Sequence, residues 1–188
     1  MYKVIENWLP KELNENILTT MTSDWFPWFY HDYVATQKEK SGDEYYFTHT
    51  FFDDVKKEIN SGFYEDLINP VLFLIGADLP LIRVKANLFT KRDKRVKYGF
   101  HSDYNKEQYK EHTTFVLSLN DNDGYTEFED GTKVPSIARQ MLIFDGHINH
   151  RSVGQTDTLN RVNININLEG DVRKYVKWVI FSTNKKFR

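Results

Sequence analysis

The sequence contains no cysteine, and this absence excludes several kinds of chemistry at once. Without thiols, these 188 residues can form no disulfide framework, no thiolate zinc site and no cysteine nucleophile. The sequence also lacks a signal peptide and any run of 18 apolar residues, so we expect no membrane contact and a cytoplasmic location. The formal net charge is only −2, which gives no general attraction to nucleic acid or to anionic membranes.

What remains is the composition of an ordinary globular protein, with 40% hydrophobic and 28% charged residues. A length of 188 residues fits one domain with a sizeable core. We therefore predict a single domain over residues 1–188, in which a β core spans about 82–182.

Short alternating segments separated by turn signals dominate the second half of the chain, and this pattern is typical of a β barrel or sandwich. Strands are predicted at Ile82–Thr90, Thr113–Leu119, Tyr125–Phe128, Val134–Ile137, Met141–Phe144, Arg161–Asn167 and Tyr175–Phe181. Turns are predicted at Asn120–Gly124 and at Asp130-Gly131, and Tyr104–Glu111 is a polar segment that permits a helix.

The first half of the chain predicts a helical layer next to the strands. Residues 2–5 and 45–52 are expected as strands, and a helix is expected after Pro10, with Leu13, Ile17 and Met21 on one face. Residues 53–76 are expected as helix, in one or two pieces. The aromatic stretch 25–33 is expected mainly in the core, with the wall of a substrate entrance as the alternative.

A candidate metal site lies between Phe100 and Arg161. If His101 and Asp103 lie on a strand, their side chains point to the same side and can bind one ion. His147 and His150 compete for the third ligand position. Two histidines and one carboxylate leave Fe(II) open positions for a chelating 2-oxo acid and dioxygen.

The segment Arg161–Asn167 alternates strictly between polar and β-branched residues. If Arg161 points inward, then Asn163, Asn165 and Asn167 also do, and Val162, Ile164 and Ile166 face the opposite layer. On Thr113–Leu119, the same argument groups Thr114 with Ser118 as candidates to reach a bound co-substrate. A buried arginine needs an anionic partner, which favours a ligand carboxylate at Arg161.

The run from Thr114 to Pro135, followed by Met141–Gly146, His150 and Arg161, resembles the 2-oxoglutarate and Fe(II) oxygenase superfamily. The prolyl-hydroxylase-like branch is closest, including its small phage-encoded members, for which the location would be the host cytoplasm. The resemblance covers roughly residues 82–168. It implies a mainly β (α+β) double-stranded β-helix, a cupin-like jelly-roll barrel, with N-terminal helices packed on one sheet.

The resemblance also implies roles for particular residues. Metal binding falls to His101, Asp103 and His150, which favours His150 over His147, and Arg161 would hold the distal carboxylate of 2-oxoglutarate. The resemblance also implies co-substrate contacts at Tyr98 and Asn87. Together with Asn163, Thr114 and Ser118, which the strand faces indicate, these are the five further candidates. Phe89 replaces a usual tyrosine, Asn163 a usual serine, and Asp123-Gly124 a usual glycine pair.

The function implied is oxidation of a substrate with Fe(II), 2-oxoglutarate and dioxygen, releasing succinate and carbon dioxide, with ascorbate as a stimulant. A protein, peptide or small-molecule substrate is favoured, and prolyl-like hydroxylation of a peptide is the leading case. One alternative is a metal-binding cupin-like barrel without redox activity. Another is a nucleic-acid-directed oxygenase that uses the basic run Lys91–Lys97, although that run also suits a solvated loop.

Overall fold

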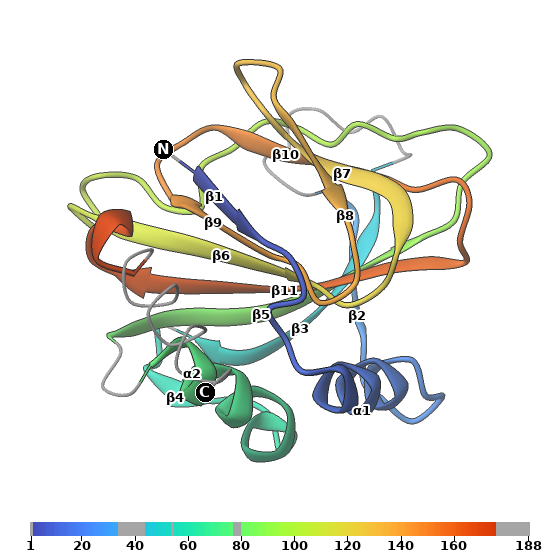
Figure 1. The fold of residues 1–188 in the computed structure, drawn as a ribbon, viewed down its shortest axis with the longest axis horizontal. Coiled ribbons are helices and arrows are strands. Elements are labelled where there is room, and N and C mark those ends of the chain that lie inside the picture. The colour runs from blue at the N-terminus through green and yellow to red at the C-terminus, as the bar shows by residue number, and fades with distance from the viewer. Residues whose placement is uncertain (1, 34–43, 54, 77–79, 176–188) are drawn as a thin grey trace.

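The computed structural model describes residues 2–33, 44–53, 55–76 and 80–175, whose strands form two stacked antiparallel sheets (Figure 1). The large sheet has the order β1-β9-β6-β11-β5-β3-β2, with β4 paired to β3, and the small sheet has the order β10-β7-β8. The strands are β1 Tyr2–Ile5, β2 Phe29–His31, β3 Tyr46–Asp53, β4 Glu58–Ile59, β5 Leu81–Thr90, β6 His112–Ser118, β7 Asn122–Phe128, β8 Lys133–Ser136, β9 Met141–Asp145, β10 His150–Val153 and β11 Asn160–Glu169. The predicted barrel or sandwich of short strands is confirmed.

Strand β11 lies in the middle of the large sheet and determines which side chains face the small sheet. Asn163 stands opposite Asn87 on β5 and opposite Ser118 on β6. Because paired residues in an antiparallel sheet share a face, these three side chains lie on one surface. The polar face predicted from the alternation of β11 is therefore continuous over three strands.

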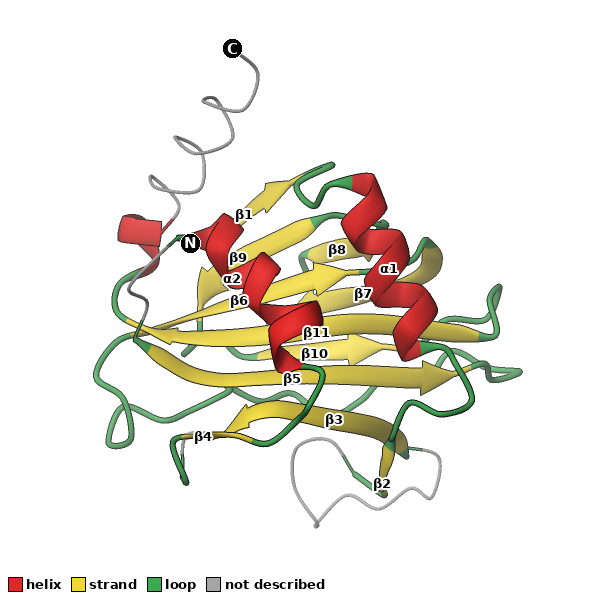
Figure 2. Ribbon diagram, turned by 90° about the horizontal axis from the view of Figure 1, so that it is seen from below, coloured by secondary structure: helices red, strands yellow, loops and turns green. Residues whose placement is uncertain are grey.

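The helices cover the other face of the large sheet (Figure 2). They are α1, Lys11–Met21, and α2, Asn69–Ile75, which follows a π-helical turn, η2, at Tyr64–Ile68. Ile17 and Met21 of α1 pack in the same apolar core as Val162, Ile164 and Ile166 of β11. The predicted helical layer and the predicted outer face of β11 are confirmed, and this packed layer holds the polar face of the sheet rigidly in place.

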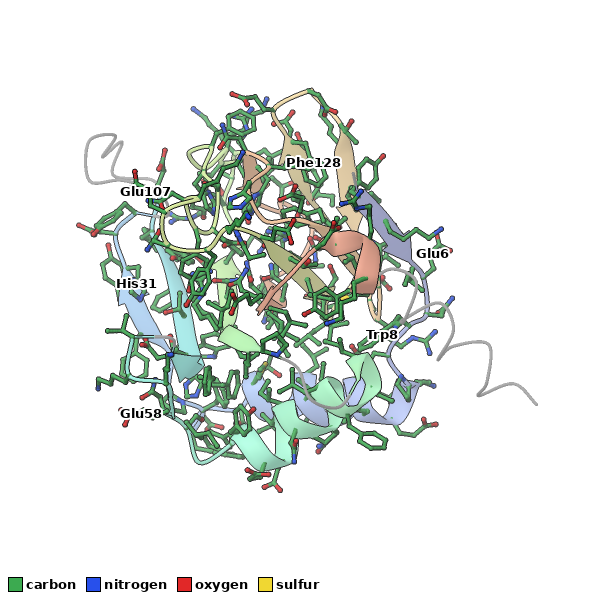
Figure 3. All side chains as sticks on the ribbon, turned by 90° about the vertical axis from the view of Figure 1, so that its left-hand side faces the viewer. Glu6, Trp8, His31, Glu58, Glu107 and Phe128 are labelled. Atoms are coloured by element: carbon green, nitrogen blue, oxygen red, sulfur yellow. The ribbon has the colours of Figure 1, made fainter. Side chains whose placement is uncertain are left out.

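A smaller apolar cluster joins the two sheets, formed by Val116, Phe128, Val134, Leu142 and Phe144. Figure 3 shows Phe128 in the upper half of the molecule and Trp8 lower down, near the helices, so that each marks one of the two apolar layers. The large sheet thus has a helical core on one side and a partly polar interior on the other.

Several local predictions are wrong. The aromatic stretch 25–33 buries Phe26, but Trp25, Phe29 and Tyr30 are about 60% exposed. Phe29 and Tyr30 belong to β2, which is an edge strand of the large sheet. Residues 58–59 form β4 rather than helix, and the helical segment begins only at Tyr64. Residues 104–111 contain turns and no helix.

The remaining differences lie at segment ends. Strand β7 begins at Asn122, inside the predicted turn 120–124. Of the predicted final strand, Tyr175 is helical and 176–181 lie outside the described residues. Within the described ranges, no helix is long and apolar enough to span a bilayer.

Candidate active site

Two histidines meet where the loop after β5 crosses strand β10. His101 and His150 form an isolated antiparallel bridge, in which each backbone N–H donates to the other's carbonyl at 3.0 and 2.9 Å. Their ring centroids are 4.7 Å apart. The backbone therefore fixes the spacing of these two side chains without help from a ligand.

Each ring is also oriented by its own neighbourhood. Nδ1 of His101 lies 3.2 Å from the Gly99 carbonyl, and Nδ1 of His150 lies 3.0 Å from the Ile148 carbonyl. A carbonyl only accepts, so each Nδ1 carries the proton and each Nε2 is free to bind a metal. Burial first, and the neighbouring His150 second, lower the pKa of His101 to about 4, so its ring is neutral at physiological pH.

Asp103 is the third member of the cluster, and the large sheet holds its carboxylate. Arg83 donates to Oδ1 at 2.9 Å, and Thr114 and Asn167 donate to Oδ2 at 2.5 and 3.0 Å. Asn165 adds a longer contact to Oδ1 at 3.4 Å. Burial alone would raise the pKa of Asp103, but Arg83 and the donors outweigh it and hold the pKa well below the usual range.

His101 and Asp103 do not lie on a strand, which corrects the expectation based on strand geometry. His101 makes one isolated bridge and Asp103 lies in a bend. Their side chains still converge, because His101 is bonded to β10 while Asp103 is bonded to the large sheet.

The ligand atoms of His101, Asp103 and His150 lie within 4.8 Å of one another. Two imidazoles and a carboxylate on one side of an ion, with the remaining positions open, are the donor set typical of non-haem Fe(II). The residues therefore fit a metal of this type. Among the described residues, no other group of three such side chains meets this spacing.

Arg161, at the start of β11, has a guanidinium with no anionic partner among the residues that the structure describes. Its side chain is 1% exposed, its Nε donates to Ser136 Oγ at 2.7 Å, and its Nη1 has no hydrogen-bond partner. The guanidinium carbon lies 5.1 Å from the centre of the Phe89 ring. Burial lowers the pKa of Arg161 to about 10, so the group stays charged at neutral pH at a cost in free energy.

A cavity of about 180 Å³ lies at the metal cluster, and Arg161 is not among its lining residues. Its wall includes all three members of the metal cluster, and it also includes Phe89, which touches Arg161. The other lining residues are Tyr46, Arg83, Lys85, Asn87, Ser102, Val116, Thr126, Ser152, Asn163 and Asn165. Arg83 and Lys85 are the positively charged lining residues, and both belong to β5.

The other predicted co-substrate residues divide into two groups. Asn87 and Asn163 line the cavity and bond to each other, with Asn87 Nδ2 donating to Asn163 Oδ1 at 2.8 Å. Thr114, Ser118 and Tyr98 are buried but are not among its lining residues. Thr114 contacts Asp103, and the Tyr98 hydroxyl, whose pKa burial raises to about 12, donates to the Tyr45 carbonyl at 3.3 Å.

The competing histidines have structural surroundings. His147 lies 3.3 Å from two backbone carbonyls and packs edge-on against His112, away from the cluster. His49 bridges the Pro27 carbonyl and Ser61 Oγ, and His31 contacts Thr48. The metal cluster therefore contains His150 and not His147.

The basic run 91–97 is a loop, as predicted, and two of its charges have local contacts. Arg95 forms an ion pair with Asp123, and the Arg92 guanidinium lies 3.5 Å from the centre of the Tyr45 ring. These contacts account for part of the positive charge within the protein.

Comparison with solved structures identifies the fold. A 2-oxoglutarate and Fe(II) oxygenase-family oxidoreductase from Burkholderia pseudomallei aligns with a TM-score of 0.63 at 12% identity, over 92% of this chain and 88% of the other. The epimerase SnoN of nogalamycin biosynthesis, described as non-haem and alpha-ketoglutarate dependent, gives 0.60 at 15%, over 90% and 77%. The viral collagen prolyl hydroxylase of Paramecium bursaria Chlorella virus-1, in its 2-oxoglutarate complex, gives 0.56 at 14%, over 90% and 96%.

These three proteins share the double-stranded β-helix with this chain, so the predicted jelly-roll architecture is confirmed. The resemblance read from the sequence is likewise confirmed at the level of fold. No protein-family model matches the sequence, and no curated protein sequence matches it.

Proposed function

We propose that this protein is a 2-oxoglutarate- and Fe(II)-dependent oxygenase, an oxidoreductase that couples oxidation of a substrate to release of succinate and carbon dioxide. His101, Asp103 and His150 hold the metal, and Arg161 binds the distal carboxylate of 2-oxoglutarate. Bound Fe(II), with 2-oxoglutarate and dioxygen, supplies the oxidising chemistry, while the protein supplies placement and exclusion of water. Ascorbate is expected to stimulate turnover.

The observation that carries this proposal is the buried Arg161 guanidinium, which has no carboxylate partner among the described residues and lies 5.1 Å from the ring of Phe89, a residue of the cavity wall. A buried charge is normally paired, yet the hydrogen bond at Nε is to a neutral hydroxyl and Nη1 has no partner. A ligand carboxylate would supply the missing countercharge through paired, charge-assisted hydrogen bonds. A metal-binding barrel without redox activity gives no reason for such an arginine.

The reaction is expected to be a hydroxylation, and a peptidyl, prolyl-like substrate is favoured. The similarity to the viral collagen prolyl hydroxylase supports this choice. The similarity to the epimerase of nogalamycin biosynthesis supports a small-molecule substrate as the alternative. Asn87 and Asn163, which line the cavity, would contact the co-substrate. Thr114 would act on it only through Asp103.

The proposal is tested by anaerobic visible absorption of the purified protein with Fe(II) and 2-oxoglutarate. Iron chelated by a 2-oxo acid gives a broad charge-transfer band, so we expect the wild type to show this band. His150→Ala should abolish it, and Arg161→Ala should require far more 2-oxoglutarate to produce it.

The matched control is His147→Ala, which removes a histidine only three residues from the cluster and should leave the band unchanged. If the wild type binds Fe(II) but gives no band at any 2-oxoglutarate concentration, the oxygenase proposal is wrong. The metal-binding barrel without redox activity would then replace it.

A further inference from the structure

Lys85 of β5 projects into the same cavity as the metal cluster. Arg83, Lys85 and Asn87 alternate along this strand, and all three line the cavity. Lys85 stands opposite Asn165 of β11, whose amide contacts Asp103 at 3.4 Å. The ammonium group therefore belongs to the wall that faces the reaction site.

The charge of Lys85 is not neutralised by a carboxylate in the described part of the chain. No described carboxylate lies within ion-pair distance of it, and its Nζ lies 5.8 Å from the centre of the Tyr46 ring. The nearby Asp103 is already bound by Arg83 at 2.9 Å and by three neutral donors. Burial first, and the neighbouring Arg83 second, lower the pKa of this half-buried amine to about 7, and a bound anionic ligand would favour its charged form.

The co-substrates do not remove this positive charge. The two charges of Fe(II) and the two charges of 2-oxoglutarate cancel, and Asp103 balances Arg83. Arg161 and Lys85 then leave the loaded cavity positive. A substrate with a negatively charged group would offset part of this positive charge.

We propose that Lys85 is a substrate-binding residue that pairs with a carboxylate of the substrate. The inference rests on the proposed oxygenase function and narrows it from an unspecified substrate to an acid. One ammonium in a cavity of about 180 Å³ suits a compact, singly charged group. The carboxylate belongs either to a small free acid or to an acidic residue of a peptide.

The test uses two small probes of nearly equal shape, propionate and propionamide. Each is titrated against the full chain saturated with Zn(II), as a redox-inert metal, and with 2-oxoglutarate, and binding is followed by ligand-observed NMR. Saturation with 2-oxoglutarate keeps the probes away from Arg161. We expect propionate to bind the wild type at least about tenfold more tightly than propionamide, as for loss of one charge-assisted hydrogen bond.

Variants then test whether Lys85 causes the preference for propionate over propionamide. Lys85→Met should bring the two affinities together, and Lys85→Arg should retain the preference for propionate. Lys11→Met is the matched control, since this lysine lies on α1 with 69% of its side chain exposed and should leave the preference unchanged. Equal affinities in the wild type, or an unchanged preference in Lys85→Met, would overturn the inference.

Two further outcomes separate this inference from the function on which it rests. Absence of the Fe(II) and 2-oxoglutarate absorption band in the wild type refutes the oxygenase proposal itself. If the band is present but Lys85→Met loses 2-oxoglutarate binding while Arg161→Met keeps it, the carboxylate at Lys85 is that of the co-substrate, and the substrate assignment fails. N-acetylglycine and N-acetylglutamate α-amide, used in the same titration, distinguish a free acid from an acidic side chain.

Discussion

Replacement of Arg161 by methionine should raise the stability of the ligand-free protein and remove its response to 2-oxoglutarate. The side chain is buried, and no carboxylate in the described part of the chain pairs with its guanidinium. Methionine fills much of the same volume without a charge. The expected gain in stability is unusual, because most substitutions of buried residues destabilise a fold.

The magnitude follows from the contacts of the guanidinium. Burial lowers the pKa of Arg161 from 12.5 to about 10, which corresponds to roughly 3 kcal/mol against the charged form. The hydrogen bond to Ser136 and the contact with the Phe89 ring each stabilise the folded wild type by about 1 kcal/mol, and both are lost in the variant. The net gain expected for Arg161→Met is therefore about 1 kcal/mol.

With 2-oxoglutarate bound, the wild type should become more stable than Arg161→Met. At a 2-oxoglutarate concentration of about 100 times its Kd, the wild type gains roughly 2.7 kcal/mol, whereas the variant gains almost nothing at the same concentration. Urea unfolding of the Zn(II)-loaded proteins, with and without 2-oxoglutarate, measures both effects. Arg173→Met, at a side chain that is 73% exposed, is the control and should leave the response intact. A variant that is several kcal/mol less stable than the wild type, yet still responds to 2-oxoglutarate, would refute the reasoning.

Three other predictions concern the surroundings of the metal cluster. Thr114→Val removes the 2.5 Å hydrogen bond to the carboxylate ligand and should lower metal affinity by roughly 10- to 100-fold, measured by competition with a chromogenic chelator; unchanged affinity would contradict it. Folding lowers the pKa of His101 from 6.5 to about 4. The neutral ring therefore contributes its full stabilisation of the folded protein above about pH 6.5, and this stabilisation is lost as the pH falls toward 4. In urea unfolding of the metal-free protein, the free energy of unfolding should fall by about 2 kcal/mol between pH 7 and pH 5. If the free energy of unfolding of His101→Gln falls by as much over this range, the prediction is wrong. A Cβ at Gly146 would lie 2.0 Å from Nε2 of His112, so Gly146→Ala should lower the free energy of unfolding by about 1–3 kcal/mol, whereas Gly62→Ala, with nothing within 4 Å, should change it by less than half as much.

The sequence predicts the strands with two chemically distinct faces most successfully. On β11, β-branched residues alternate with asparagines, and on β5 apolar residues alternate with polar ones, so the period of two is unmistakable. The four residues of β10 show no such contrast, and this strand was not predicted. The same limit applies to residues 25–33, where aromatic content does not reveal that the edge strand stays uncovered.

For the candidate site, residue identity and sequence order were enough to select the cluster, but its geometry was not predictable. The spacing of His101 and Asp103 suggested one strand, whereas the two side chains are held by different sheets. Lys85 was visible as a member of a polar strand face. Its significance depends on which carboxylates lie near it, and pairing between strands distant in sequence decides that.

The division of the cluster between two sheets has a mechanical consequence. His150 belongs to the small sheet and is bonded to His101, whereas the partners of Asp103, among them Arg83 and Thr114, belong to the large sheet. An ion held by these side chains would cross-link the two sheets. Loss of the ion would remove this cross-link and leave the helix-covered core intact, so amide hydrogen exchange should rise mainly along β10 and its neighbours. The metal would then stabilise the contact between the two sheets in addition to its role in the reaction.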